Sequence, residues 1–238
     1  MNSEELVRFA KLFNVVALLT YLIPLGVGLY RWRSLQAVYR PLFWFVLIPG
    51  CLLNGALAEF GRHVLHNNVL FLQLATVGET LLLGWAYYGC LHSERARQIL
   101  LAALGIFTGI YLFELLYLNG GNFRAAQDVY THVAQSILLI SAAVAYFEQT
   151  LRELRNIDLG QDSMFMVSVG SILYYAGTLM VFVLEGQLQN QPDLIWMMYI
   201  IQFILLIVFN TFLAIALWNG NRQIEAADVP LGWPNGYL

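Results

Sequence analysis

Seven long apolar stretches occupy almost the whole of this chain, and each is long enough to cross a bilayer as a helix. Backbone groups in lipid must be hydrogen-bonded internally, and runs this continuous favour helices over barrel strands. We therefore predict an all-α, polytopic integral membrane protein with one seven-transmembrane-helix domain (1–218) and a short cytoplasmic tail (219–238). The predicted helices are Leu6–Tyr30, Pro41–Leu65, Asn68–Leu91, Gln98–Leu118, Asp128–Leu151, Ser163–Leu188 and 193–218.

The composition supports a membrane protein and excludes a nucleic-acid-binding one. Of the 238 residues, 59% are hydrophobic and only 11% are charged, whereas a soluble domain carries about 25% charged residues. The net charge of −3 is small, and the chain has no Lys/Arg-rich run that a phosphate backbone would require. Cys51 and Cys90, the only cysteines, fall in apolar stretches and are interpreted as free thiols.

The basic residues predict an orientation. Loops one, three and five and the tail hold eight of them, and the other side holds four. Because cytoplasmic loops carry the excess of Lys and Arg, we predict the N-terminus outside and the C-terminus inside, in a bacterial inner membrane. The first group is Arg31, Arg33, Arg40, Arg95, Arg97, Arg152, Arg155 and Arg222, and the second is Arg8, Lys11, Arg62 and Arg124.

Several apolar stretches carry ionisable residues in their predicted outer halves. A polar stripe on an apolar membrane helix normally faces the bundle interior, because lipid cannot satisfy it. Glu79, in the middle of the third stretch, must be protonated, paired or in contact with a wet cavity. We therefore predict one outward-facing polar pocket whose ligand-binding residues are Glu59, His63, Glu79, Glu114, His132 and Glu185.

The same residues allow a metal site as an alternative. Glu59 and His63 are four residues apart and share a helical face, so both side chains could bind one ion. His132 could supply a third ligand, and histidine with carboxylate suits zinc or iron. Nucleophilic catalysis has no support, since Ser168 and Ser171 do not lie in a nucleophile elbow.

Some seven-helix families are excluded by their own motifs. Microbial rhodopsins need a Schiff-base lysine in the last helix, but the only lysine here is Lys11. Seven-helix zinc hydrolases of the ceramidase type carry a histidine pair in the final helix, and residues 193–218 contain no histidine.

In layout and length, the chain resembles the seven-helix sensory regions at the N-terminus of some bacterial histidine kinases. The resemblance covers most of the chain but rests on no specific motif, so no residue role follows from it. The chain ends about twenty residues after the seventh apolar stretch, with no kinase domain. The resemblance therefore implies output through a separate cytoplasmic signalling partner.

These observations favour a sensor or receptor-like membrane protein. It would bind a small ligand, ion or proton in the outward-facing pocket and signal to a partner at the inner face, where basic loops would contact that partner or anionic lipid. The alternatives are a membrane-embedded metal-dependent hydrolase, a transporter or a structural subunit. A transporter is disfavoured because the predicted inner half has few ionisable residues away from its loop edges.

Overall fold

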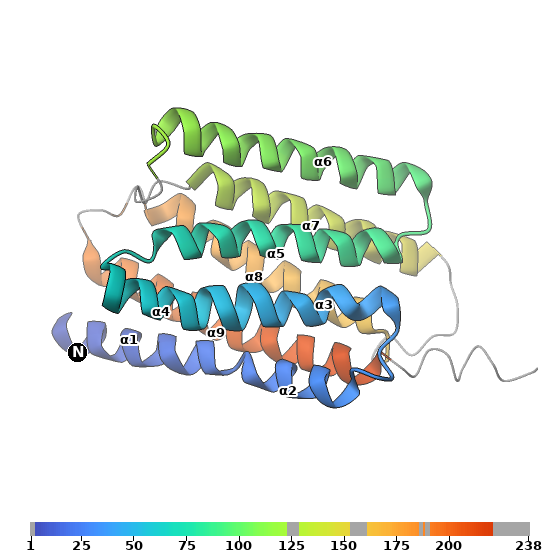
Figure 1. Cartoon of the computed structure of the whole chain (residues 1–238), viewed down its shortest axis with the longest axis horizontal. Helices are drawn as coiled ribbons and strands as arrows, with labels where there is room; N and C mark the ends of the chain where they lie inside the picture. The colour runs from blue at the N-terminus through green and yellow to red at the C-terminus, as the bar shows by residue number, and fades with distance from the viewer. Residues whose placement is uncertain (1–2, 123–128, 153–160, 186–187, 189–190, 221–238) are drawn as a thin grey trace, which may run out of the picture.

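The computed structural model describes residues 3–122, 129–152, 161–185, 188 and 191–220. This part of the chain is all-helical and contains seven helical spans that are long and apolar enough to cross a membrane. The spans lie roughly antiparallel in one bundle (Figure 1). They are Glu4–Arg31, Ala37–Leu65, Val69–Cys90, Glu94–Leu118, Val129–Arg152, Ser163–Leu184 and Asp193–Asn219. The predicted seven-helix bundle is thus confirmed, whereas the orientation stays a prediction.

The first span is two helices, α1 (Ser3–Leu19) and α2 (Leu22–Arg31), where we expected one. Pro24 causes the break because it has no N–H to donate to the carbonyl of Thr20, four residues earlier. That carbonyl instead accepts from the N–H of Ile23 at 3.1 Å. The break leaves Tyr21 buried between the two helices, facing the second span.

The second span departs most from regular α-helix. It begins with a 3₁₀ turn (Ala37–Tyr39) and α3 (Arg40–Phe45), earlier than the predicted start at Pro41. A π-helical stretch (Val46–Leu57) contains Pro49 and is followed by α4 (Ala58–Phe60) and a second π-helical stretch (Gly61–Leu65). Pro49 has no N–H to donate within the helix, and both prolines and π-helical turns are common where helices depart from regular geometry. π-Helical turns are also frequent at functional sites.

The remaining helices are α5 (Val69–Cys90), α6 (Glu94–Phe113), α7 (Val129–Arg152), α8 (Ser163–Glu185) and α9 (Pro192–Asn219). A π-helical turn (Glu114–Leu118) continues α6. This helix begins four residues before the predicted Gln98, because the Ser93 hydroxyl accepts a bond from the Ala96 N–H at 3.5 Å and caps it. Helix α8 packs between α7 and α9, and α6 lies outermost beside α7 (Figure 1).

The two ends of the bundle are distinguished by the helices that begin there. The N-terminal end comprises the starts of α1, α5, α7 and α9, and the opposite end comprises the starts of α3, α6 and α8. Fully buried apolar side chains fill the opposite half, among them Leu83, Leu139, Met164, Leu213 and Leu217. Large aliphatic side chains such as Ile99 and Ile106 are exposed on the outside of the bundle, a pattern typical of helices that contact lipid.

Candidate functional site

A cavity of about 530 Å³ lies in the N-terminal half of the bundle. Side chains from α1, the second span, α5, α7, α8 and α9 line it. Its lining runs from Arg62, Val69 and Trp196, near the N-terminal end, to Glu79 and Tyr21. Glu79 lies ten residues along α5 from Val69, about 15 Å at the α-helical rise, so the cavity reaches the middle of the bundle.

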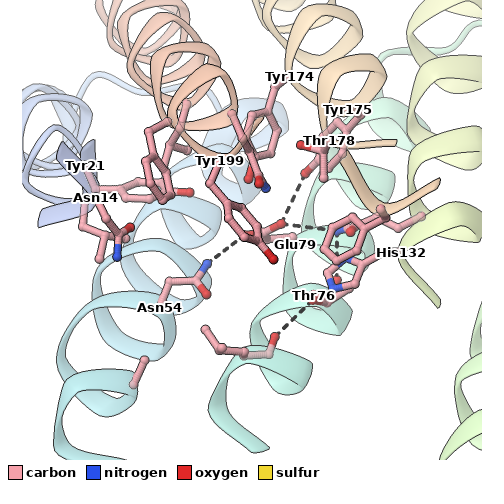
Figure 2. A pocket seen from close by; sticks show the side chains of 18 of the residues that line it. Asn14, Tyr21, Asn54, Thr76, Glu79, His132, Tyr174, Tyr175, Thr178 and Tyr199 are labelled. Carbon is pink, nitrogen blue, oxygen red and sulfur yellow. Dashed lines mark hydrogen bonds between the residues drawn. The ribbon is translucent and has the colours of Figure 1, made fainter. Parts of the chain in front are cut away.

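The Glu79 carboxylate, which is buried, accepts hydrogen bonds from three neighbouring helical segments. Asn54 Nδ2 donates to Oε1 at 3.0 Å, Gln135 Nε2 donates to Oε2 at 3.2 Å, and the Tyr175 hydroxyl approaches Oε2 at 3.5 Å. Asn54 belongs to the first π-helical stretch, Gln135 to α7 and Tyr175 to α8. Glu79 therefore joins these segments at one point, pointing into the space between Asn54, Tyr199 and His132 (Figure 2).

His132 also lines this cavity and lies close enough to Glu79 for an electrostatic interaction. Its ring stacks on Phe182, with the ring centroids 4.0 Å apart and the planes 10° from parallel. Of the six predicted ligand-binding residues, Glu79 and His132 are thus the two whose side chains the structure places in one cavity.

Glu59 and His63 are placed elsewhere. Glu59 Oε1 is 2.7 Å from Arg62 Nη1, and Oε2 is 3.3 Å from His63 Nε2. His63 is 76% exposed at its side chain and does not line the cavity. The four-residue spacing that put both side chains on one face also lets them pair with each other, on the outside of the bundle.

Glu114 caps a helix instead of lining the cavity. Its carboxylate accepts from the backbone N–H groups of Tyr130 at 3.2 Å and Thr131 at 2.8 Å, and from the Thr131 hydroxyl at 2.5 Å. These N–H groups belong to the first turn of α7, where helical N–H groups have no partner within the helix. The side chain of Glu185, the last residue of α8, lies outside the described part of the structure.

The predicted metal ligands do not come together as a group. Within the described residues, no three His, Cys, Asp or Glu side chains are placed to hold a metal ion. His132 faces the cavity, whereas Glu59 and His63 pair at the outer surface. The predicted zinc or iron stays a prediction without a ligand set in this structure.

The spacing places Gln135 on one polar helix face with His132, and Tyr174 and Thr178 on another with Glu185, and these three uncharged residues line the cavity. Sequence reasoning misses most of the other uncharged cavity residues. The sequence pattern favours interhelical bonding for Asn54 and packing for the tyrosine pair Tyr174–Tyr175. The signal present for Gln135 is its position three residues after His132 on the same face of α7. The full aromatic lining consists of Tyr21, Tyr174, Tyr175, Phe182, Trp196, Tyr199 and Phe203.

Asp162 lies in a predicted inner loop, where the sequence pattern gives it no special role, but the structure buries it. Its Oδ1 accepts from the N–H groups of Met164 at 2.9 Å and Phe165 at 3.1 Å, which caps α8. The Tyr146 hydroxyl of α7 donates to the same carboxylate at 2.8 Å. Asp162 therefore ties the start of α8 to α7 at the opposite end of the bundle.

Comparisons of the chain with protein families, curated proteins and solved structures find no match. What the cavity can do therefore follows from its residues and their geometry.

Proposed function

We propose that this chain is an integral membrane protein of the receptor type, which binds a small molecule in the Glu79 cavity. The seven apolar spans support a place in the membrane, most simply a bacterial inner membrane. The excess of basic residues in loops one, three and five favours the cavity opening to the outside. The layout shared with sensory regions of histidine kinases agrees with this proposal.

The observation that carries the proposal is a buried carboxylate at the inner limit of a cavity. A charge in the hydrocarbon region is costly, so intramembrane acids are commonly kept for function. The volume of about 530 Å³ falls within the range of small-molecule sites, roughly 300–1,000 Å³. Mostly apolar walls with a few convergent polar groups are also typical of such sites.

The packing below Glu79 favours a receptor over a transporter. Among the described residues, the cavity lining stops at the level of Glu79, Gln135 and Leu206. Beyond this level the bundle is closed by fully buried side chains such as Leu83, Tyr87 and Leu139. In the described part of the chain, the cavity that a ligand would enter from the N-terminal end therefore does not continue to the opposite end.

The walls of the cavity offer a route for a signal. Tyr174 and Tyr175 of α8 pack on Phe209 of α9, with centroid distances of 5.4 and 6.2 Å. Helices α8 and α9 both continue to the opposite end, where the basic loops would meet a cytoplasmic partner. A ligand that moves Tyr174 or Tyr175 would shift α8 against α9, one of the usual ways in which helical proteins switch state.

Native mass spectrometry of the purified protein, incubated with small-molecule extracts of cells, tests this function. A Gln202→Trp variant would fill the cavity, and Leu101→Trp, on an exposed face of α6, is the matched control. We expect a ligand mass on the wild type and on Leu101→Trp that is lost in Gln202→Trp. Equal ligand binding by all three proteins, or by none, would contradict the proposal.

A further inference from the structure

The orientation of the Gln135 side chain is fixed by its neighbours. Its Nε2 atom lies 3.2 Å from the backbone carbonyl oxygen of Thr76 and 3.2 Å from Glu79 Oε2. Because a backbone carbonyl can only accept, the amide NH₂ group must point this way and donate to both atoms. Glu79 Oε2 is thus a hydrogen-bond acceptor.

The other oxygen of Glu79 also accepts a hydrogen bond. Asn54 Nδ2 donates to Oε1 at 3.0 Å, and the Tyr175 hydroxyl adds a longer contact with Oε2. An ionised carboxylate can only accept, whereas a protonated acid must donate once. Donors at both oxygens are therefore the surroundings that suit the ionised form of Glu79.

The hydrogen-bond partners of Glu79 do not neutralise its charge. Its three hydrogen-bond donors are neutral groups. Arg62, the arginine in the cavity lining, forms an ion pair with Glu59 at 2.7 Å. Among the described residues, no Lys or Arg lies within ion-pair distance of Glu79. His132 lines the same cavity and interacts electrostatically with Glu79, but an imidazole carries a charge only when it is protonated. Since a buried charge is stable only when it is compensated, the carboxylate is suited to a permanent cation from outside the chain.

The walls around this carboxylate are rich in aromatic rings. Seven of the 21 lining residues are aromatic. Tyr199 lines the same cavity as Glu79, and its ring contacts those of Trp196 and Phe203 at centroid distances of 6.0 and 6.4 Å. The negative faces of such rings attract organic ammonium groups, most strongly when water is excluded. A metal ion needs several oxygen or nitrogen ligands, and among the described residues no three His, Cys, Asp or Glu side chains are placed to supply them.

We propose that the ligand of this cavity is a small organic cation with an ammonium group. The ammonium would bind the Glu79 carboxylate, and the organic part would pack against the rings of Tyr174, Trp196 and Tyr199. This inference rests on the proposed function, because it names the chemical class of the small molecule that the cavity binds.

Three probes of similar shape and different charge test the inference. Phenethylammonium, 2-phenylethanol and 3-phenylpropionate share a phenyl ring and a short chain but are cationic, neutral and anionic at neutral pH. Each is titrated to about 10 mM against the purified full-length protein in detergent, and binding is read from the rise in melting temperature, which grows with ligand concentration over Kd. We expect phenethylammonium to bind at least about tenfold more tightly than the other two.

Two variants test whether the Glu79 carboxylate is the group that binds phenethylammonium. Glu79→Gln keeps the size of the side chain and removes its charge, so the preference for phenethylammonium over 2-phenylethanol should disappear. Glu94→Gln makes the same change at an exposed glutamate that pairs with Arg97 away from the cavity, and it should bind like the wild type. The comparison of the three probes on the wild type decides the inference even if Glu79→Gln does not fold.

The outcomes separate this inference from the function on which it rests. If the neutral or anionic probe binds the wild type as tightly as phenethylammonium or more tightly, the ligand is not an organic cation. The cavity would still be a small-molecule site. No binding of phenethylammonium would also overturn the inference. The proposed function fails instead if the wild type, Gln202→Trp and Leu101→Trp bind a ligand from the cell extracts equally, or if none of them binds one.

Discussion

Glu79 and Asp162 are both buried carboxylates of this bundle, yet only Glu79 faces a cavity. Asp162, at the opposite end, is 4% exposed, and its partners are two backbone N–H groups and the Tyr146 hydroxyl. Glu79 is 7% exposed, and its partners are side chains from three different segments. Burial alone therefore does not mark a binding site. The distinguishing features are donors that come from separate helices and space next to the carboxylate.

Glu114 strengthens this comparison because it lies in the same half of the bundle as Glu79. It is 3% exposed and caps α7, so its position near the N-terminal end does not make it part of the cavity. Asp162 and Glu114 thus cap helices. Of the buried acids in the described residues, Glu79 is the one that is placed to bind a ligand.

The largest expected effect on stability is that of Asp162→Ala. The change removes the cap of α8 and leaves the Tyr146 hydroxyl buried without its acceptor, at a cost of about 3 kcal/mol in unfolding free energy. Thermal or denaturant unfolding in detergent measures it. Tyr146→Phe added to Asp162→Ala should cost less than the two single changes summed, and full additivity would argue against this contact.

Gly50→Ala should perturb the cavity directly. A Cβ atom at Gly50 would lie 2.6 Å from the ring of Tyr21, which lines the cavity, so the ring must move, at a cost of about 1–3 kcal/mol. Gly105→Ala is the control, because a Cβ there meets nothing within 4 Å. We expect Gly50→Ala to have a lower melting temperature and weaker ligand binding than the wild type, and Gly105→Ala to match the wild type in both. Equal melting temperatures for the two variants would contradict the close approach of Tyr21.

Glu114→Ala should cost about 1–2 kcal/mol in unfolding free energy, the usual effect of losing a helix cap. Glu59→Ala, which breaks only surface pairs, should change it by less than about 0.5 kcal/mol. Unfolding in detergent compares the two variants. Ligand binding should persist in both, and its loss in Glu114→Ala without a change in melting temperature would place Glu114 in the site.

Glu79→Gln should have the smallest effect on stability of the changes at the three buried acids. The glutamine keeps the size of the side chain and removes a charge that is costly to bury. Its NH₂ group would face Asn54, whose amide can turn to present its oxygen, so the melting temperature should stay close to that of the wild type. The same variant should lose ligand binding. A large loss of stability with binding retained would show that Glu79 is structural, like Asp162.

The fold could be predicted from the sequence because the length of an apolar run sets the length of a helix. Glu79 could be predicted for a similar reason, since an acid in the middle of an apolar run is too costly to keep unless protein or water compensates it. The cap at Asp162 was also predictable in principle, because Asp directly before the start of a helix is a common capping residue.

The partners of Glu79 could not be predicted in the same way. Asn54 and Gln135 are placed by the rotation of each helix about its axis, which the lengths of apolar runs do not determine. Spacing was misleading for Glu59 and His63, because two residues four apart can bind one ligand or simply pair with each other. Tyr174 and Tyr175 are adjacent, so their side chains point in different directions from α8. Both line the cavity because the side of α8 between these two directions faces the cavity.

The proposed function depends on a cavity that opens at the N-terminal end of the bundle and ends at Glu79. Single cysteines at Gln202, a partly exposed residue of the cavity lining, and at Ser168, which is fully buried in α8, give the sharpest test in a protein whose Cys51 and Cys90 are replaced. We predict that a small membrane-impermeant thiol reagent, added from the N-terminal side of proteoliposomes, labels Gln202→Cys quickly and leaves Ser168→Cys unmodified. Protection of both cysteines, or equal labelling of both, would contradict the account.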